Sequence, residues 1–173
     1  HSLVLSEMKI RNCAISPSQE LIAIGTGEGN IVLLSSKSLA TVHQWKAHEQ
    51  SVNAVCFHPN GKWLLSGAKD AHLNCWEIEN NFELTISIPA HNYAIYSIVF
   101  HPNEKLFATG SRDKTIKLWN SDTLEFLLRI ENSEHQGHIN SVNSLYWSTY
   151  NNYLISGSDD RSLMVWETEV NYE

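Results

Sequence analysis

Three residue types that could perform chemistry recur at fixed spacing in this chain: a histidine, a hydroxyl residue and an aspartate. The histidines are His48, His91 and His138, which lie 43 and 47 residues apart. Each is followed by a serine or threonine and, four residues after that, by an aspartate. Ser, His and Asp are the residues of the nucleophilic triad, in which imidazole takes the hydroxyl proton and the carboxylate orients the imidazole. The recurrence therefore raises hydrolytic catalysis as a first hypothesis.

A fourth residue type argues against catalysis. Each aspartate is followed six residues later by a tryptophan, namely Trp76, Trp119 or Trp166. An indole N–H can only donate a hydrogen bond, whereas a nucleophilic hydroxyl has to face a pocket with an oxyanion hole. A catalytic triad also occurs once in an enzyme, and this set occurs three times. We therefore predict no catalytic residues and no enzymatic activity, and keep an enzyme with a site in a central channel as the alternative.

The elements that carry these residues read as short strands separated by turns. In the repeat that begins at His91, an apolar run over 95–100 is followed by a turn at 101–103, a second run over 106–109 and a third over 116–119. Short apolar runs bounded by turn residues predict β-strands, and no stretch carries a convincing helical period. The sequence thus predicts an all-β chain.

These repeats resemble the WD-repeat β-propellers, whose units of about 40–45 residues begin with Gly-His, end with Trp-Asp and form one four-stranded blade each. No copy ends in a literal Trp-Asp here, because Trp76 and Trp166 precede Glu and Trp119 precedes Asn. The resemblance implies a β-propeller made of four-stranded antiparallel blades, with four blades in a single segment over 1–173. The expected blades are approximately 8–47, 48–90, 91–137 and 138–173.

The resemblance also implies that the recurrent residues form buried, hydrogen-bonded sets that hold each blade together. Such a set stabilises a fold only when every donor finds an acceptor. The three expected structural tetrads are His48/Ser66/Asp70/Trp76, His91/Thr109/Asp113/Trp119 and His138/Ser156/Asp160/Trp166.

The first repeat, over 8–34, keeps the strand pattern and loses the polar set. Aligning Pro17 with Pro59 and Pro102 puts an apolar residue at two of the four positions. Replacing a buried polar network by apolar groups need not destabilise a protein. In that register, Ser6 stands for the His, Ile24 for the hydroxyl, Glu28 for the Asp and Leu34 for the Trp.

The first repeat also contains Gly25-Thr-Gly27-Glu-Gly29, which resembles a dinucleotide-binding fingerprint. That motif requires a helix directly after it, and the following run over 31–34 is typical of a strand. We interpret the glycines as a turn between two strands. No cofactor is predicted.

The fourth repeat ends before a fourth strand would form, and the apolar residues 2–5 are the expected closing strand. A half ring of four blades would leave apolar faces and sheet edges exposed, and such surfaces associate. We consider two explanations. Either two chains join head to tail as a homodimer that forms an eight-bladed ring, or the chain is a non-catalytic fragment of a larger propeller-containing regulatory protein.

Composition narrows the class of partner and the compartment. Among 173 residues the formal net charge is −7, which disfavours nucleic acid and anionic membranes. Three cysteines without a Cys-x-x-Cys motif favour free thiols and a cytoplasmic location. The one tight group of metal-binding residue types is Glu134, His135 and His138, which we interpret as a solvated loop rather than a metal site.

A propeller of this family is implied to act as a rigid scaffold for protein–protein interaction. Partners are expected to dock on its top face, at positions that flank the inner strand and precede the Asp. We expect this face to bind a protein or peptide, possibly an acidic or phosphorylated one, since several positions are cationic. The top-face residues are Lys9, Arg11, Ser51, Asn53, Lys69, Ala94, Tyr96, Arg112, Ser141, Asn143 and Asp159.

Overall fold

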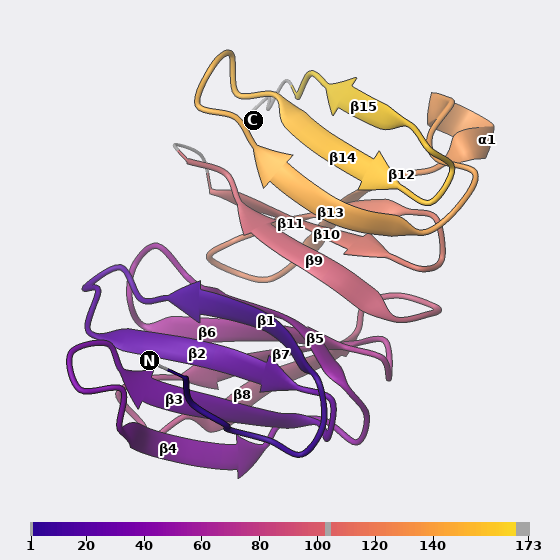
Figure 1. Cartoon of the computed structure of the whole chain (residues 1–173). Helices are drawn as coiled ribbons and strands as arrows, with labels where there is room; N and C mark the ends of the chain where they lie inside the picture. The colour runs from indigo at the N-terminus through magenta and orange to yellow at the C-terminus, as the bar shows by residue number, and fades with distance from the viewer. Residues whose placement is uncertain (1, 103–104, 169–173) are drawn as a thin grey trace. The chain divides into compact units, whose positions relative to one another are not determined.

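The computed structural model describes residues 2–102 and 105–168, and its strands form four antiparallel sheets (Figure 1). We number these sheets as blades one to four in chain order. Blade one consists of β1 (Ile10–Ile15), β2 (Leu21–Thr26), β3 (Asn30–Ser35) and β4 (Thr41–Lys46). Blade two consists of β5 (Val52–Phe57), β6 (Trp63–Ala68), β7 (His72–Glu77) and β8 (Glu83–Pro89).

The two remaining blades follow the same order. Blade three consists of β9 (Ile95–Phe100), β10 (Leu106–Ser111), β11 (Ile116–Asn120) and β12 (Phe126–Ile130). Blade four has three strands among the described residues, β13 (Val142–Trp147), β14 (Leu154–Ser158) and β15 (Leu163–Trp166). The prediction of an all-β propeller chain built from antiparallel blades is confirmed. Residues 169–173, where the fourth repeat was expected to end without a fourth strand, lie outside the described residues.

The chain divides into two compact units, 1–98 and 99–173, each with its own core. In the first unit, one face of blade one, with Ile31 and Leu33, packs against Val52, Val55 and Leu64 of blade two. In the second unit, the core is shared between blades three and four in the same way. Its buried members are Leu106, Ala108, Ile116, Leu118, Ile130, Val142, Leu145, Trp147 and Leu154.

Each inner strand whose pairing the structure resolves carries a bulge near its start. The registers of β1, β5 and β13 shift by one residue at Arg11, Asn53 and Asn143. A bulged residue is left out of the ladder and its side chain is re-aimed. All three residues belong to the top-face positions expected from the sequence.

Turns of the expected kind separate the strands. Gly29 has a φ of +88°, and a Cβ there would lie 2.3 Å from the carbonyl oxygen of His48, so this turn requires glycine. Gly61 has a φ of +73°, in the turn between β5 and β6. The glycine-rich stretch of the first repeat is thus the β2–β3 turn, and strand β3 rather than a helix follows it.

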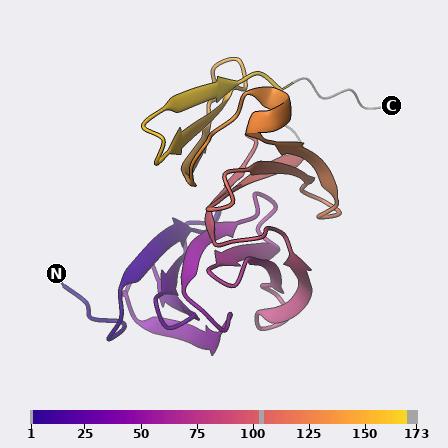
Figure 2. The ribbon, with the colours of Figure 1, turned by 90° about the vertical axis from the view of Figure 1, so that its right-hand side faces the viewer.

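Two local features were not expected from the sequence. Residues 2–5 form no strand within this chain, where Leu5 packs against Ile24, Val32 and Leu34 of blade one. Their expected role as a closing strand for the last blade stays a prediction. The insertion before blade four contains a single helical turn, α1 (Asn132–His135), which Figure 2 shows beside the end of β12. The helical turn ends at Gln136, which has a left-handed φ of 53° and whose N–H donates to the carbonyl of Asn132. One turn is too short to produce a helical period in the sequence.

Candidate functional site

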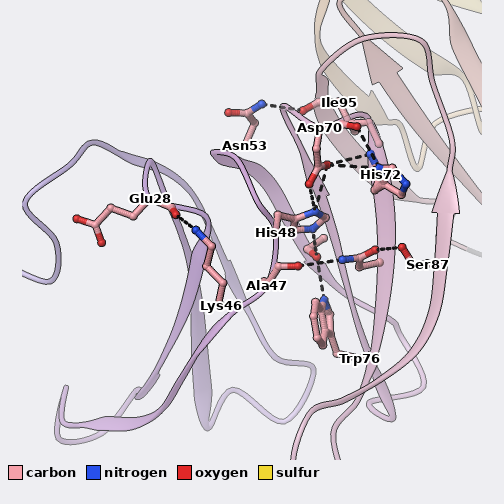
Figure 3. Close-up of polar contacts among 12 residues, drawn as sticks. Glu28, Lys46, Ala47, His48, Asn53, Asp70, His72, Trp76, Ser87 and Ile95 are labelled. Carbon is pink, nitrogen blue, oxygen red and sulfur yellow. Dashed lines mark hydrogen bonds and ion pairs between the residues drawn. The ribbon is translucent and has the colours of Figure 1, made fainter.

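The first set of recurrent residues is brought together inside blade two (Figure 3). His48 lies between two partners, with Nε2 2.8 Å from Oγ of Ser66 and Nδ1 3.0 Å from Oδ2 of Asp70. Nε1 of Trp76 lies 2.8 Å from the same Ser66 oxygen. Ser66 is 0% exposed and His48 is 4% exposed, so the set is enclosed by the blade.

The donors in this set can be assigned from the chemistry of its members. The indole of Trp76 can only donate, so Ser66 Oγ accepts from it. A carboxylate can only accept, so His48 Nδ1 carries the proton shared with Asp70. The unprotonated Nε2 of His48 then accepts the hydroxyl proton of Ser66. The resulting series of hydrogen bonds runs from Trp76 to Ser66, from Ser66 to His48 and from His48 to Asp70. Each buried side-chain donor in the series has an acceptor.

Blade four repeats this arrangement closely. His138 lies 2.8 Å from Oγ of Ser156 through Nε2 and 2.9 Å from Oδ2 of Asp160 through Nδ1. Nε1 of Trp166 lies 2.8 Å from Oγ of Ser156. Asp160 accepts three further hydrogen bonds, from the Ile139 amide and from the amide and hydroxyl of Ser162. Two blades in different units thus build the same network from the same four residue types.

The set of blade three is divided between the two units. Within the second unit, Nε1 of Trp119 donates to Oγ1 of Thr109 at 2.9 Å, and Thr109 is 0% exposed. Asp113 accepts from the amide and the hydroxyl of Thr115, at 3.1 Å and 2.6 Å. His91, in the first unit, is buried.

Blade one keeps part of its polar set although two of its residues are apolar. Ile24 and Leu34 pack together in a small buried cluster, as their apolar side chains predict. Ser6 Oγ nevertheless donates to Oε1 of Glu28 at 3.2 Å, so the two polar residues at the His and Asp positions still meet. Sequence reasoning treated this pair as lost, because neither residue matches the repeat type.

The aspartates have lowered pKa values for a local reason. Burial alone would raise the pKa of Asp70, but hydrogen bonds from His48 and from the His72 amide outweigh burial and lower the pKa. Burial likewise acts to raise the pKa of Asp160, and hydrogen bonds from Ser162 and His138 hold it well below its usual range. Both carboxylates are thereby kept ionised as acceptors.

The residue after each aspartate adopts a left-handed conformation in every blade. Ala71, Lys114 and Arg161 have φ values of 67°, 73° and 69°, and Gly29 occupies the same position in blade one. This conformation turns the chain so that the carboxylate can accept the amide two residues after it. The Gly29 carbonyl also accepts the His48 amide at 3.0 Å, which anchors the start of the next repeat. Backbone φ values of this kind could not be read from residues such as Ala and Lys.

The expected top-face residues gather at one edge of each blade. In blade two the Lys69 amide donates to the Ser51 carbonyl at 2.9 Å, and in blade four the Asp159 amide donates to the Ser141 carbonyl at 3.1 Å. In blade one the Gly27 amide donates to the Lys9 carbonyl at 2.8 Å in the same way. In these three blades, the start of the inner strand therefore lies beside the turn between the second and third strands.

The exposure of these residues differs widely. Lys9, Arg11, Lys69, Arg112, Asn143 and Asp159 are exposed, Asn53 and Tyr96 are half-buried, and Ser51, Ala94 and Ser141 are buried. Asn53 donates to the Ile95 carbonyl at 3.2 Å, and Asn143 donates to Asp159. Among the top-face residues of the first unit, the exposed cations are Lys9, Arg11 and Lys69.

Sequence reasoning missed a second polar contact in blade two. The buried amide of Asn74 donates to the Ala47 carbonyl at 2.9 Å and accepts from Ser87 Oγ at 2.7 Å. Asn is uncommon in strands, and that rarity was the available signal. A polar hollow of about 270 Å³ lies beside this contact, lined in part by Lys46, Glu49 and His72.

The geometry of the recurrent sets does not suit nucleophilic catalysis, although the distances resemble those of a triad. Ser66 and Ser156 are both 0% exposed, so neither hydroxyl can reach a substrate. Each hydroxyl oxygen also accepts from an indole, which holds it inside the blade. The arrangement can hold strands in register and cannot present a nucleophile.

Among the described residues, no group of three or more His, Cys, Asp or Glu side chains is placed to hold a metal ion. Over the same residues, 2–102 and 105–168, no helix has the length and apolar character needed to span a bilayer.

The fold and the repeated buried sets define a repeat protein of the β-propeller class. The family model "WD domain, G-beta repeat" matches residues 39–77, 82–120 and 131–167. The chain belongs to this WD40 family. The matches contain strands β4 to β11 and β13 to β15, whereas β12 and the degenerate first repeat over 8–34 fall outside them.

Similar proteins match segments of this chain. Telomerase Cajal body protein 1 of Mus musculus is 36% identical over 76 residues, or 43% of this chain and 14% of that protein. Nuclear distribution protein nudF of Aspergillus niger is 33% identical over 75 residues, covering 43% of this chain and 17% of that protein. Striatin-4 of Mus musculus is 31% identical over 72 residues, covering 42% of this chain and 10% of that protein. The chain therefore matches only a small part of the length of these relatives.

Proposed function

We propose that this chain is a non-catalytic scaffold for protein–protein interaction, and that its top face binds an acidic or phosphorylated protein segment. The observation that carries the proposal is the placement of Lys9, Arg11 and Lys69, which are exposed at one blade edge of a chain with net charge −7. Membership of the WD40 family supports a role in protein interaction.

The position of Arg11 adds a physical reason for recognition at this edge. Arg11 is the bulged residue of β1, and it is exposed. A bulge takes the residue out of the ladder, so its side chain is free to serve a partner rather than the sheet. Arg forms bidentate hydrogen bonds with carboxylates and phosphates and is enriched among interface hot spots.

Charge reversal tests this proposal. The Arg11→Glu/Arg112→Glu double variant should weaken binding of a fluorescent phosphoserine- and glutamate-rich peptide at least about tenfold, measured by anisotropy. The matched control is Lys37→Glu/Lys62→Glu, which makes the same change of charge at exposed turns on the opposite blade edge. The control should bind nearly as well as the parent chain. Equal loss in both variants would indicate a net-charge effect and would contradict a top-face site.

We also propose that the chain associates with a second copy, giving a homodimer with eight blades. The support is apolar surface at both ends of the repeat array. Ile10 and Ile15 of blade one are 49% and 62% exposed, and Leu163 of blade four is 68% exposed. The small part of each relative that is matched supports the alternative, in which these blades belong to a longer regulatory protein.

A cytoplasmic location is proposed on cysteine chemistry. Cys13, Cys56 and Cys75 are all free thiols, and burial raises the pKa of Cys56 to about 12, which keeps that thiol protonated. Unpaired cysteines persist in reducing compartments. Alkylation of all three thiols in denatured protein taken directly from cells would support this location, and a native disulfide would contradict it.

A further inference from the structure

In blades one, three and four, the residue two positions after the carboxylate of the set donates its side chain to that carboxylate. In blade three the Thr115 hydroxyl donates at 2.6 Å, and in blade four the Ser162 hydroxyl does the same. The degenerate blade one keeps this relation, since Nδ2 of Asn30 donates to Oε2 of Glu28 at 3.3 Å. A side chain at this position therefore serves the carboxylate even where the rest of the set has changed.

Blade two is different, because His72 stands at this position and directs its side chain to the backbone. Nδ1 of His72 lies 3.0 Å from the carbonyl oxygen of Asp70 and 3.9 Å from its carboxylate oxygen Oδ1. The imidazole therefore donates to the backbone, which leaves Nε2 of the neutral ring as an acceptor. The Asp70 carboxylate receives no side-chain donor from the position that supplies one in the other blades.

The carboxylate of Asp70 consequently has unused acceptor sites. A carboxylate offers about four lone-pair sites. In blade four, Asp160 accepts from four donor groups. Among the described residues, Asp70 accepts from two, the His48 imidazole and the His72 amide. The Asp70 side chain is also 17% exposed, against 5% for Asp160, so a donor from outside the chain can approach it.

Asp70 lines the polar hollow of about 270 Å³ beside the buried amide of Asn74, and the other lining groups are mostly acceptors. His72 brings its unprotonated Nε2 to the lining, and Figure 3 shows His72 and Ser87 on the same side of the molecule relative to His48. This volume suits a single side chain, because pockets for larger ligands usually span about 300–1,000 Å³.

The charges of the lining favour a cationic ligand. Glu49 is exposed and has no ion-pair partner among residues 2–102 and 105–168. The cationic side chain of the lining is Lys46, whose Nζ donates to the Glu28 carbonyl at 2.6 Å. Figure 3 shows Lys46 directed toward Glu28 and away from His72. The hollow is therefore left with two carboxylates, Asp70 and Glu49, and the formal net charge of −7 adds to the attraction.

We propose that this hollow binds the guanidinium group of an arginine side chain from a partner protein. One edge of the guanidinium donates two parallel hydrogen bonds to the unused sites of Asp70, and its other N–H groups reach Glu49 and Nε2 of His72. A planar group with five donors suits a lining of acceptors better than a compact ammonium does. The site is separate from the cationic top-face residues, none of which lines the hollow, and it takes the opposite charge.

The smallest probe is N-acetylarginine methylamide, added at millimolar concentration and followed by ¹⁵N NMR. The side-chain signals of His72 and Asn74 should shift as the probe binds. The citrulline derivative has a similar shape without the charge, and the lysine derivative has the charge without the planar fork. Each should bind at least about tenfold more weakly. Equal binding of either derivative would overturn the guanidinium assignment, and unchanged signals of both residues would overturn the site.

A substitution that repairs the carboxylate should close the site. In His72→Thr the new hydroxyl should donate to Asp70, as Thr115 does in blade three. The arginine probe should then bind at least about tenfold more weakly, although the variant should unfold at no lower temperature than the parent chain. Parent-like affinity of a folded His72→Thr variant would contradict the proposal.

A second pair of variants tests the site without touching the buried set. Glu49→Gln, in the exposed loop before β5, should weaken binding of the arginine probe severalfold. Glu20→Gln makes the same change of charge at the exposed β1–β2 turn and should bind as the parent does. Equal loss in both variants would indicate a net-charge effect and would overturn the site. Because the probe is a single arginine derivative, none of these results depends on the acidic-peptide test of Arg11.

Discussion

The indole N–H of Trp76 donates to Oγ of Ser66 at 2.8 Å across the β6–β7 pair. The Ser66 hydroxyl in turn donates to Nε2 of His48, also at 2.8 Å. The same relation joins Trp166 to Ser156 at 2.8 Å in blade four. A hydroxyl can accept from an indole and donate to an imidazole at once, through a single oxygen atom. The serine is therefore the residue on which the whole set depends.

Ser66→Ala should destabilise the chain. The substitution leaves the indole of Trp76 and Nε2 of His48 buried without a partner, which costs about 1–3 kcal/mol. Urea unfolding followed by tryptophan fluorescence measures this difference. Ser38→Ala, at an exposed turn, should change stability by less than about 0.5 kcal/mol. Equal stability of the two variants would contradict a structural role for Ser66.

Asp160→Asn should flatten the dependence of stability on pH in acid. The pKa of Asp160 is lowered in the folded chain, so its contribution is complete above the usual carboxyl pKa of about 3.9 and is lost as pH falls toward the folded value. The free energy of unfolding of the parent chain should therefore drop more between about pH 6 and about pH 3 than that of Asp160→Asn. An exposed comparison is Asp122→Asn, which should follow the parent curve. Parallel curves for parent and Asp160→Asn would exclude the linkage.

Ala71→Gly should not destabilise the chain, against the usual effect of introducing glycine. Ala71 has a φ of 67°, and the left-handed conformation costs a residue with a Cβ about 1–2 kcal/mol. Relief of that strain should equal or exceed the entropy that glycine adds to the unfolded chain, about 0.4–1 kcal/mol. Ala40→Gly, at an exposed position without a positive φ, gains no such relief and should lose about 0.4–1 kcal/mol of stability. Thermal unfolding of both variants makes the comparison.

Ile24→Thr should be unfavourable although it restores the residue type of the other blades. Leu34 stands where the indole would donate, so the new hydroxyl would be buried at a site now 7% exposed, facing Leu34 and Val32. An unpaired buried hydroxyl costs about 1–3 kcal/mol in proteins. Val42→Thr, at a site 57% exposed, is the comparison and should change little. A gain of stability on Ile24→Thr would contradict this prediction. It would show that a buried hydroxyl can stabilise blade one without the His, Asp and Trp that accompany it in the other blades.

The sequence predicted the features that depend on residue type and spacing. The recurrent His, hydroxyl, Asp and Trp positions indicated the family, and the run over 95–100 coincides with β9. Features that depend on backbone conformation or on tertiary packing could not be predicted from residue type. The left-handed φ of Lys114 has no signature in its side chain, and α1 is too short to show a period.

Residues 2–5 illustrate a different limit. Their apolar pattern predicts a strand, but a strand needs an edge to pair with, and the sequence does not say which edge is available. In this chain Leu5 buries its side chain against Ile24 and Leu34 instead. Leu163 and Leu73 occupy the same register, yet one is 68% and the other 1% exposed, so residue type alone does not fix exposure.

The most direct test of the central claim is the imidazole tautomer in the native chain. ¹⁵N NMR of the histidine side chains should place the proton of His48 and His138 on Nδ1, toward Asp70 and Asp160, with Nε2 as an acceptor from serine. The indole N–H groups of Trp76 and Trp166 should exchange slowly with solvent. Protons on Nε2, or fast exchange of both indoles, would contradict a closed chain of buried hydrogen bonds that holds each blade together.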